Sequence, residues 1–207
     1  KRAVIDFVSD GTDLYAASHI SGVYKLNGDS WKNITGDLPD MGFNQIVENG
    51  GKLYLAGGCD VGMHGAPRIN DPKIINSIYM SENGGQNWDP LMDNDPFEGP
   101  VKCIVPMDDS RILAATQTGV YLSTNGGTTW TPENTGLDFV SIGAFAAGNS
   151  RIYAGTLGGG VYGGAISVSN EVTWEESAGP DPHISNIQIK IDPNDSNILY
   201  ATAFPGG

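Results

Sequence analysis

One phrase occurs twice in this sequence, and its repetition limits the fold more than any other feature. The chain reads IYMSENGGQNW over residues 78–88 and VYLSTNGGTTW over residues 120–130. Tyr, Ser, Asn, Gly, Gly and Trp stand in the same order and at the same spacing in both copies. A fixed internal period indicates a repeat architecture, in which one supersecondary unit is copied along the chain.

The aromatic residues extend this repeat to the whole chain. Each of the 4 Trp residues follows a Val-Tyr or Ile-Tyr pair. The remaining Tyr residues lie in a second phrase, which reads DLYAAS, KLYLAG, RIYAGT and ILYATA; RILAAT is a further copy with Leu113 in place of Tyr. Each unit therefore reads as short strands a, b, c and d: an apolar strand, the LYAA phrase, the Val-Tyr phrase and a segment that begins at the Trp. Polar turns join strands a and b.

A period of about forty residues with four strands per unit is typical of a β-propeller, in which each unit is one antiparallel blade. The sequence predicts an all-β fold and a single propeller over residues 1–207. We expect blades at residues 3–41, 42–99, 100–139, 140–183 and 184–207, the last with strands a and b only. Because ring closure protects sheet edges, these four and a half blades are expected to belong to a larger closed propeller. Further sequence or a partner chain would complete it.

Composition limits the classes of partner. The formal net charge is −13, and only 17% of the residues are charged. Nucleic acids and anionic lipid surfaces are bound by clustered Lys and Arg, so neither is expected here. No apolar run approaches the ~20 residues that cross a bilayer, so membrane insertion is not expected either. Neutral glycans, cations and basic protein surfaces remain.

The cysteines and sequons leave two questions open. Cys59 and Cys103 match no metal motif, so they are either two buried thiols or one disulfide. Asn33 and Asn194 begin N-glycosylation sequons, which matter if the chain is exported.

The repeated phrase resembles the Asp-box, or BNR repeat, whose pattern is Ser/Thr-x-Asp-x-Gly-x-x-Trp. The matching residues are Ser81, Asn83, Gly85, Trp88, Ser123, Asn125, Gly127 and Trp130. Asn83 and Asn125 stand where the family usually has Asp. The resemblance implies a hairpin between strands c and d at the rim of the propeller, away from the central pocket. Gly supplies positive φ, Ser and Asn bond the turn, and Trp packs on it, so we expect a structural role.

Strand directions alternate, so the b–c and d–a loops share one face of the propeller, which is the face where propellers usually bind. The candidate ligand-binding residues all lie in these loops: His19, Asp60, His64, Arg68, Asp93, Asp95, Glu98, Asp138, Asp181 and His183. The insert from Cys59 to Asn76 interrupts the repeat on this face and is the strongest candidate contact loop. The alternative is that an acidic protein simply has acidic, turn-forming loops.

No cofactor and no metal are expected. The segment MDNDPFEG has oxygen ligands at the density of a calcium site, but it lacks the full EF-hand pattern. Calcium is therefore the one alternative that we keep.

Asp-box propellers of the sialidase superfamily include sialidases, xyloglucan-cleaving hydrolases, the sortilin-type receptor domain and a photosystem II assembly factor. Sialidases use three Arg residues, but Arg111 and Arg151 both begin the strand b phrase and fit a scaffold role. The xyloglucan-cleaving family carries a catalytic Asp in a Thr-Asp-Val/Ile-Gly-Gly-x-Tyr loop. Here the loop reads SHISGVY, with His19 at that place.

We therefore expect a non-catalytic propeller, extracellular or at the cell surface (periplasmic as a variant), that binds a glycan or a protein through its b–c and d–a loops. One alternative is a sialidase- or xyloglucanase-like glycoside hydrolase. Its paired carboxylates would lie in the d–a loops or in blades outside this sequence. A third is a self-associating assembly protein of an envelope or filament. Catalytic residues stay unknown.

Overall fold

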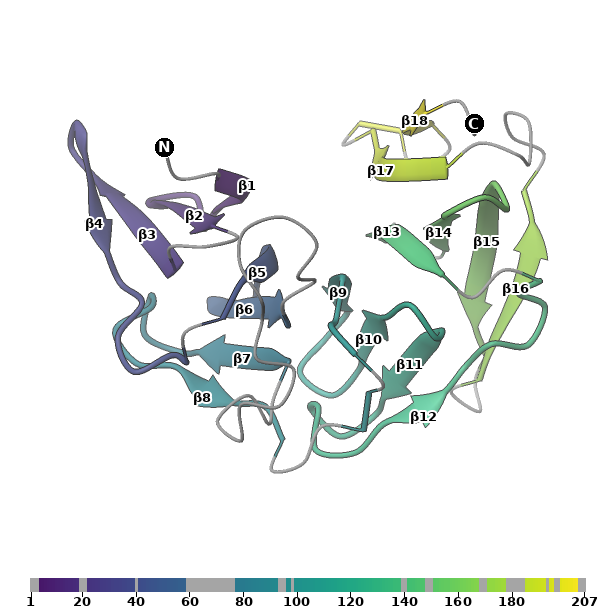
Figure 1. The fold of residues 1–207 in the computed structure, drawn as a ribbon, viewed down its shortest axis with the longest axis horizontal. Coiled ribbons are helices and arrows are strands. Elements are labelled where there is room, and N and C mark those ends of the chain that lie inside the picture. Colours follow the sequence, from purple (N-terminus) through teal and green to yellow (C-terminus); the bar gives the residue numbers. More distant parts are fainter. Residues whose placement is uncertain are drawn as a thin grey trace.

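The computed structural model describes residues 4–18, 22–39, 41–58, 77–92, 96–97, 99–138, 141–147, 151–167, 171–177, 185–192, 194–195 and 198–204. All the regular secondary structure in these ranges is β-strand. The strands form five separate antiparallel sheets arranged as an arc (Figure 1). The predicted all-β fold, a partial β-propeller of antiparallel blades, is confirmed.

Four of the sheets contain four strands each, in chain order, and the fifth contains two. The first blade consists of β1 (Val4–Ser9), β2 (Leu14–Ser18), β3 (Gly22–Asn27) and β4 (Ser30–Asn33). The second consists of β5 (Phe43–Asn49), β6 (Lys52–Gly57), β7 (Ile78–Ser81) and β8 (Asp89–Pro90). The third consists of β9 (Cys103–Pro106), β10 (Ile112–Ala115), β11 (Val120–Ser123) and β12 (Thr131–Pro132). The fourth consists of β13 (Ile142–Ala147), β14 (Ile152–Thr156), β15 (Val161–Ile166) and β16 (Val172–Glu176), and the fifth of β17 (Ser185–Ile191) and β18 (Leu199–Phe204).

The first strand of each blade lies nearest the centre of the arc, and the fourth strand lies at its rim (Figure 1). Successive inner strands contact one another along the series β1, β5, β9, β13 and β17. In most of these strands the pairing register shifts by one residue near the start, for example between Val4 and Asp6 and between Phe43 and Gln45. Such a bulge takes one residue out of the ladder and bends the strand, here beside the centre.

Strand register is the same in every complete blade. Phe7 pairs with Ala16, which pairs with Tyr24; in the fourth blade Phe145, Ala154 and Tyr162 form the same row. We call the face that carries this row the front face of a blade and the opposite face its back face. The repeated phrases of the sequence therefore correspond to fixed places in each sheet.

The hydrophobic core lies between the blades, because each sheet is thin and buries its faces only against a neighbour. Leu113, Ala115 and Leu122 on the back face of the third blade form one buried cluster with Phe145 and Trp174 of the fourth. Phe145 and Trp174 stack with their ring centroids 6.1 Å apart. Further clusters of the same kind join the first blade to the second and the second to the third.

The front face of the first blade is the exception to this burial. Phe7 is 54% exposed and Trp31 is 43% exposed, whereas Phe145 and Trp174 at the same repeat positions are 6% and 2% exposed. Apolar side chains of Val4, Phe7, Ala16, Tyr24 and Trp31 line a hollow of about 330 Å³ on this face. The first blade stands at one end of the arc (Figure 1), so no described blade precedes it.

Trp174 and Trp31 hold the same repeat position, one buried and one exposed, and therefore make a matched test of packing. We expect W174A to lower the free energy of unfolding by about 3–5 kcal/mol, because it removes a fully buried ring from a blade junction. W31A changes the same repeat position where the ring is exposed, and we expect about 1 kcal/mol or less. Urea unfolding of both variants, followed by circular dichroism, measures the difference. Equal losses of stability in the two variants would contradict the view that the protein is stabilised mainly by the junctions between blades and not by the single sheets.

Candidate functional site

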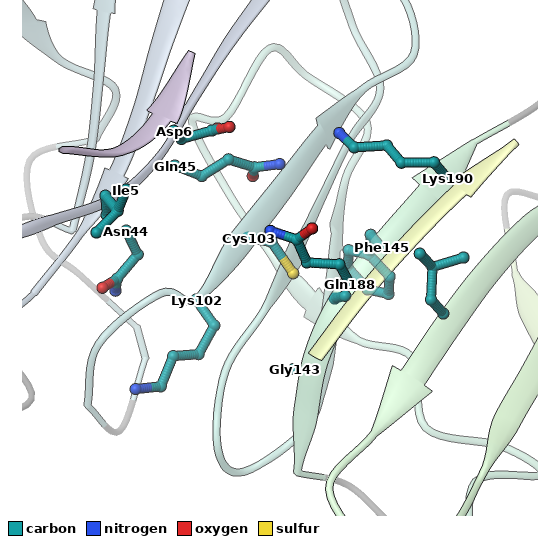
Figure 2. Close-up of a pocket in the computed structure, with 12 residues that line it drawn as sticks. Ile5, Asp6, Asn44, Gln45, Lys102, Cys103, Gly143, Phe145, Gln188 and Lys190 are labelled. Carbon is teal, nitrogen blue, oxygen red and sulfur yellow. The ribbon is translucent and has the colours of Figure 1, made fainter. Parts of the chain in front are cut away.

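A small polar cavity lies where the inner strands of all five blades meet (Figure 2). Its volume is about 120 Å³. The polar side chains that line it are Asp6, Asn44, Gln45, Lys102, Gln188 and Lys190. In the first four blades the lining residues lie at or near the start of the inner strand, which is the end that the d–a loops lead into.

Side chains beside this cavity connect the first four blades in series. The Ile46 amide N–H donates to the Asp6 carboxylate over 3.0 Å, and the Ile104 amide N–H donates to the Gln45 side-chain oxygen over 2.7 Å. Cys103 holds the same repeat position and accepts a hydrogen bond from the backbone of Phe145. Ala144 stands at this position in the fourth blade and has no side-chain acceptor. These polar groups are thus used for joining inner strands.

Asn44 makes a further connection of this kind. Its side-chain amide donates to the Val101 carbonyl over 2.8 Å, between the second blade and the start of the third. Because buried backbone groups need partners, this bond satisfies a carbonyl that has left the regular ladder. Part of the cavity lining therefore serves to hydrogen-bond backbone groups of the neighbouring blade.

Asp6 is the carboxylate among the described lining residues. Burial raises the pKa of Asp6, while hydrogen bonds from the Ile46 and Phe7 backbone and the charge of Lys190 act against that rise. Glycoside hydrolysis requires two carboxyl groups that flank the scissile bond. The described part of the cavity supplies one, and that one already accepts a backbone N–H.

The two repeated phrases fold into the same hairpin, between β7 and β8 and between β11 and β12. The Ser81 hydroxyl accepts the Gly85 N–H over 2.9 Å and donates to the Asn83 side-chain oxygen. Asn83 also accepts the Gln86 and Asn87 N–H groups over 3.1 and 3.0 Å.

The second copy repeats these bonds with one exception, because the Thr128 N–H donates to the backbone carbonyl of Asn125 and not to its side-chain oxygen. The Ser123 hydroxyl accepts the Gly127 N–H over 2.8 Å, and the Asn125 side-chain oxygen accepts the Thr129 N–H over 2.9 Å. Gly85 and Gly127 have φ of +80° and +92°, which favours glycine. A side-chain acceptor and a positive φ together explain why the phrase keeps Ser, Asn and Gly at fixed spacing.

These hairpins also contact the preceding blade, which the sequence did not suggest. The Trp88 indole N–H donates to the Ile34 carbonyl of the first blade over 3.0 Å. In the fourth blade the Trp174 indole donates to the Glu133 carbonyl of the third over 2.9 Å, whereas the Trp130 indole bonds Gly127 in its own hairpin. A Cβ on Gly85 would stand 2.4 Å from the Ile34 side chain. The phrase therefore stabilises junctions between blades as well as its own turn.

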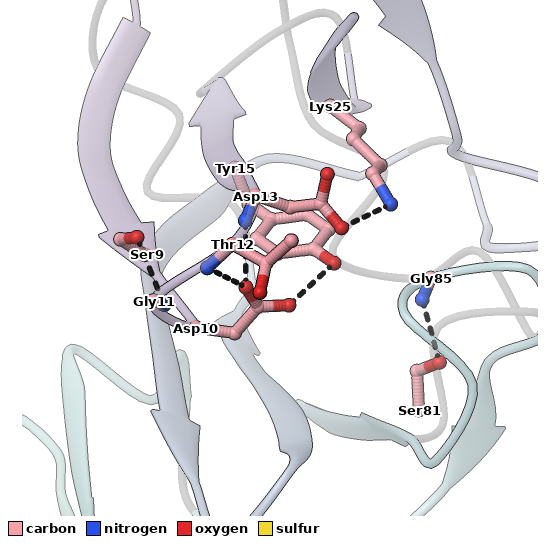
Figure 3. Close-up of polar contacts among 9 residues, drawn as sticks. All are labelled: Ser9, Asp10, Gly11, Thr12, Asp13, Tyr15, Lys25, Ser81 and Gly85. Atoms are coloured by element: carbon pink, nitrogen blue, oxygen red, sulfur yellow. Dashed lines mark hydrogen bonds and ion pairs between the residues drawn. The ribbon is translucent and has the colours of Figure 1, made fainter.

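Figure 3 shows the a–b turn of the first blade, around Asp10, beside the second-blade hairpin that contains Ser81 and Gly85. Because strand directions alternate, the a–b turns and the c–d hairpins share one side of the propeller. The Asp10 carboxylate accepts the Thr12 and Asp13 N–H groups and the Tyr15 hydroxyl. Asp192 accepts the Asn194 N–H and the Tyr200 hydroxyl in the same way. These acidic side chains form turns, which accounts for part of the negative charge of the chain.

Of the predicted ligand-binding residues, the structure describes Asp138 alone. Asp138 is exposed, and its backbone N–H bonds the buried hydroxyl of Tyr162 in the fourth blade. The others lie outside the described residues: His19, Asp60, His64, Arg68, Asp93, Asp95, Glu98, Asp181 and His183. The insert from Cys59 to Asn76 lies outside them as well. The convergence of these loops on one face stays a prediction.

Cys103 is a buried free thiol whose pKa burial raises to about 12. A thiol protonated at neutral pH is a poor nucleophile and a poor metal ligand, so its role here is structural. Within the described ranges, no three His, Cys, Asp or Glu side chains gather as a metal site would require. The same ranges contain no helix that is long and apolar enough to cross a membrane.

The residues that line the cavity were not among the sequence candidates. Asn44, Gln45 and Lys102 stand at the start of strand a, where the sequence shows polar residues in otherwise apolar strands. These polar residues in apolar strands were the one sign in the sequence that the strand starts line a polar cavity. Asn44 and Gln45 lie at the bulge of β5, which depends on pairing with strand b and is not revealed by periodicity alone.

Comparison with known proteins shows the fold and no closer relationship. No family model matches the chain, and no curated protein matches it. Among solved structures, an ancestral GH74 enzyme is similar over 99% of this chain and 28% of its own length, at 24% identity and a TM-score of 0.66. YCF48 bound to a D1 peptide is similar over 98% of this chain and 62% of its own length, at 14% identity and a TM-score of 0.63. The structure of the RRP9 WD40 repeats is similar over 97% of this chain and 60% of its own length, at 15% identity and a TM-score of 0.70.

The chain thus spans about a quarter to three fifths of the length of these structures, which include enzymes and non-enzymatic propellers. At such identities the likeness establishes the class of fold: this chain is part of a β-propeller. The likeness does not select an activity.

The hairpin bonds predict different outcomes for two neighbouring residues. We expect S81A to lower the free energy of unfolding by about 1–3 kcal/mol, because the buried Gly85 N–H loses its acceptor. N83D keeps an oxygen for the Gln86 and Asn87 N–H groups and for the Ser81 hydroxyl, so it should change stability by about 0.5 kcal/mol or less. Urea unfolding measures both variants, and an S81A protein as stable as N83D would contradict the assigned bonds.

Asp6 and Asp108 should respond to pH in opposite directions. Burial raises the pKa of Asp6 above 3.8, so the folded protein loses stability as pH rises through that raised pKa. The pKa of Asp108 is lowered below 3.8: burial acts to raise it, but hydrogen bonds from Arg111 and Ser110 outweigh burial. Asp108 therefore contributes stability above its ordinary pKa, and that stability is lost as pH falls through the lowered value.

Thermal unfolding of D6N and D108N between about pH 3 and pH 7 tests this pair. D6N keeps an acceptor for the Ile46 N–H, so its stability relative to the wild type should increase with pH, by up to about 1.4 kcal/mol for each unit by which the pKa of Asp6 is raised. D108N should be less stable than the wild type at pH 7, and the gap should narrow as pH falls. Parallel curves for all three proteins would refute the assigned environments.

Proposed function

We propose that this chain is a non-catalytic propeller module that binds a protein or glycan partner through its b–c and d–a loops, outside the cell or at its surface. The observation that supports it most is the use of the central cavity. Asp6, Gln45 and Asn44 bond backbone groups of the neighbouring blade and are not held ready for a substrate. Catalysis at the centre of a propeller would need polar side chains that are free to contact a substrate.

Charge supports a particular kind of partner. The chain carries a net charge of −13, and the turn acids of the opposite face are already bonded to their own backbone. The loop acids, Asp138 among them, then set the potential of the binding face. A basic surface on a protein is the partner that this potential attracts, because complementary charge speeds association and excludes wrong partners.

The hairpins support the assignment of these blades to the Asp-box type. Ser81 and Ser123 accept the same glycine N–H in both copies, and Asn83 and Asn125 supply the oxygen that the usual Asp would supply. On this proposal the phrase has a structural role, and recognition belongs to the other face. YCF48, which was solved with a bound D1 peptide, is an example of a propeller of this shape that takes a peptide.

A glycoside hydrolase is the second candidate. The likeness to an ancestral GH74 enzyme covers nearly the whole chain and favours it, while His19 stands where the xyloglucan-cleaving family has Asp. Its carboxylates would come from the d–a loops, from Asp93, Asp95 or Asp181.

Equal charge changes on the two faces test the proposal. We expect D93N/D138N to weaken the binding of a Lys- and Arg-rich peptide selected from an array by about tenfold, because both acids lie in d–a loops. E82Q/D109N removes the same charge from the hairpin face and should leave the affinity within about twofold. Fluorescence anisotropy gives both dissociation constants.

Equal weakening by the two variants would reject the loop face as the binding face. Xyloglucan and aryl sialosides should be incubated with the same proteins. Sugar release that D93N/D138N abolishes and E82Q/D109N preserves would establish the hydrolase and overturn the proposal.

A further inference from the structure

One backbone donor beside the central cavity has no acceptor among the described residues. The N–H groups of Ile46, Ile104 and Phe145 hold the same repeat position, and each donates to a side chain of the preceding blade. Ile189 pairs with Ala201 in the register in which these three residues pair with their own strands b. The Ile189 N–H therefore also points away from strand b and toward the fourth blade, but no described group there accepts it.

The missing acceptor has a defined place in the repeat. In the first three blades the side chain of Asp6, Gln45 or Cys103 accepts the N–H of the next inner strand, whereas the fourth blade has Ala144 at that position. Ile189 is 2% exposed and Ala144 is 8% exposed, so both are shielded from bulk water. Because buried backbone N–H groups are almost always hydrogen-bonded, an acceptor is expected beside Ala144.

The charges that line the cavity favour a negatively charged acceptor. Lys102 and Lys190 are the cations of the described lining, and Asp6, its one carboxylate, already accepts the Ile46 N–H. Lys190 extends from β17 across the cavity toward Gln45 (Figure 2). The described lining thus has more positive than negative charge, although the chain as a whole carries −13. Hydrogen bonds to a carboxylate oxygen are about twice as strong as those to a neutral acceptor.

The size of the cavity limits the ligand. A volume of about 120 Å³ holds a few water molecules or one small molecule. Gly143 and Ala144 form the wall next to the inner strand of the fifth blade and contribute little side chain to it. The space therefore suits a molecule of a few non-hydrogen atoms, of the size of formate or acetate.

We propose that the central cavity binds a small carboxylate, with one oxygen in the place of the acceptor that Ala144 lacks. That oxygen accepts the Ile189 N–H, and the Lys190 ammonium group balances its charge. The bound carboxylate thereby joins the fifth blade to the fourth, as side chains join the first four blades to one another. This site is separate from the loops of the proposed function, so each proposal can fail without the other.

Isoleucine amides provide the test and its internal control. In protein labelled with nitrogen-15 isoleucine, Ile46, Ile104 and Ile189 report on the same repeat position in three blades. Sodium acetate, exchanged for sodium chloride at constant ionic strength, should shift the Ile189 amide resonance saturably. We expect a dissociation constant of about 1–10 mM, because so small a ligand makes few contacts. Ile46 and Ile104 have side-chain acceptors, so their resonances should barely move.

Two substitutions at Ala144 test where the ligand lies. A144C adds an acceptor of the kind that Cys103 provides in the third blade, so under reducing conditions it should abolish the response of Ile189 to acetate. A144G is the matched control, because it leaves the position without an acceptor and should keep the affinity within about threefold. An A144C protein that responds to acetate as A144G does would overturn the placement.

The charge of the lining is tested separately. K190Q removes a cation from the cavity and should weaken acetate binding by about threefold or more. K32Q removes a cation from β4, at the rim, and should leave the affinity within about twofold because that distant charge is screened. Equal affinities in the two variants would overturn the role given to Lys190.

The outcomes separate the proposal from its alternatives. A saturable shift that is confined to Ile189 and lost in A144C supports it. No shift with acetate or formate overturns it, since water then satisfies the Ile189 N–H. Equal shifts of Ile46, Ile104 and Ile189, or the same Ile189 shift when chloride is added in place of acetate, would show a general effect of salt and would also overturn it.

Discussion

Front-to-back packing between blades is the interaction on which the rest of this structure depends. No sheet here is thick enough to have a core of its own, so the front faces of the second to fifth blades pack against the back face of the preceding blade. The Phe145–Trp174 stack under Leu113 and Leu122 shows the arrangement at its most complete. At Phe7 and Trp31, before which no blade is described, the same kinds of side chain are exposed.

Polar groups strengthen these junctions at both edges of the sheets. Near the centre, Asp6 and Gln45 bond the inner strand of the next blade. At the rim, the Trp88 and Trp174 indoles bond carbonyls of the preceding blade. The apolar surface between the blades provides the driving force, and these directed bonds set how far one blade can slide along its neighbour. This is why so many of the polar residues that the sequence shows turn out to be structural.

The sequence predicted the architecture well and the central cavity poorly, and the reasons are physical. The Val-Tyr and LYAA phrases revealed the blades because strand pairing repeats with the same register, as in Ala16 with Tyr24 and Ala154 with Tyr162. Asn44 and Gln45 could not be placed because a bulge in β5, invisible to period-two patterns, decides where they point. The partners of the Trp indoles were missed for another reason: they lie in the preceding blade, far away in sequence. The loop residues, except Asp138, lie outside the described structure, so their convergence stays a prediction.

Every junction in this arc joins unlike surfaces, and this has a consequence for assembly. An isologous dimer places the same patch of each copy against itself. Two first blades meeting in that way would oppose two front faces, and none of the contacts seen at the described junctions would form. The arc is therefore directional, like a polymer with two different ends, and a blade can extend it at Phe7 only by presenting its back face. Such polarity lets a repeat made of nearly interchangeable units keep a single order.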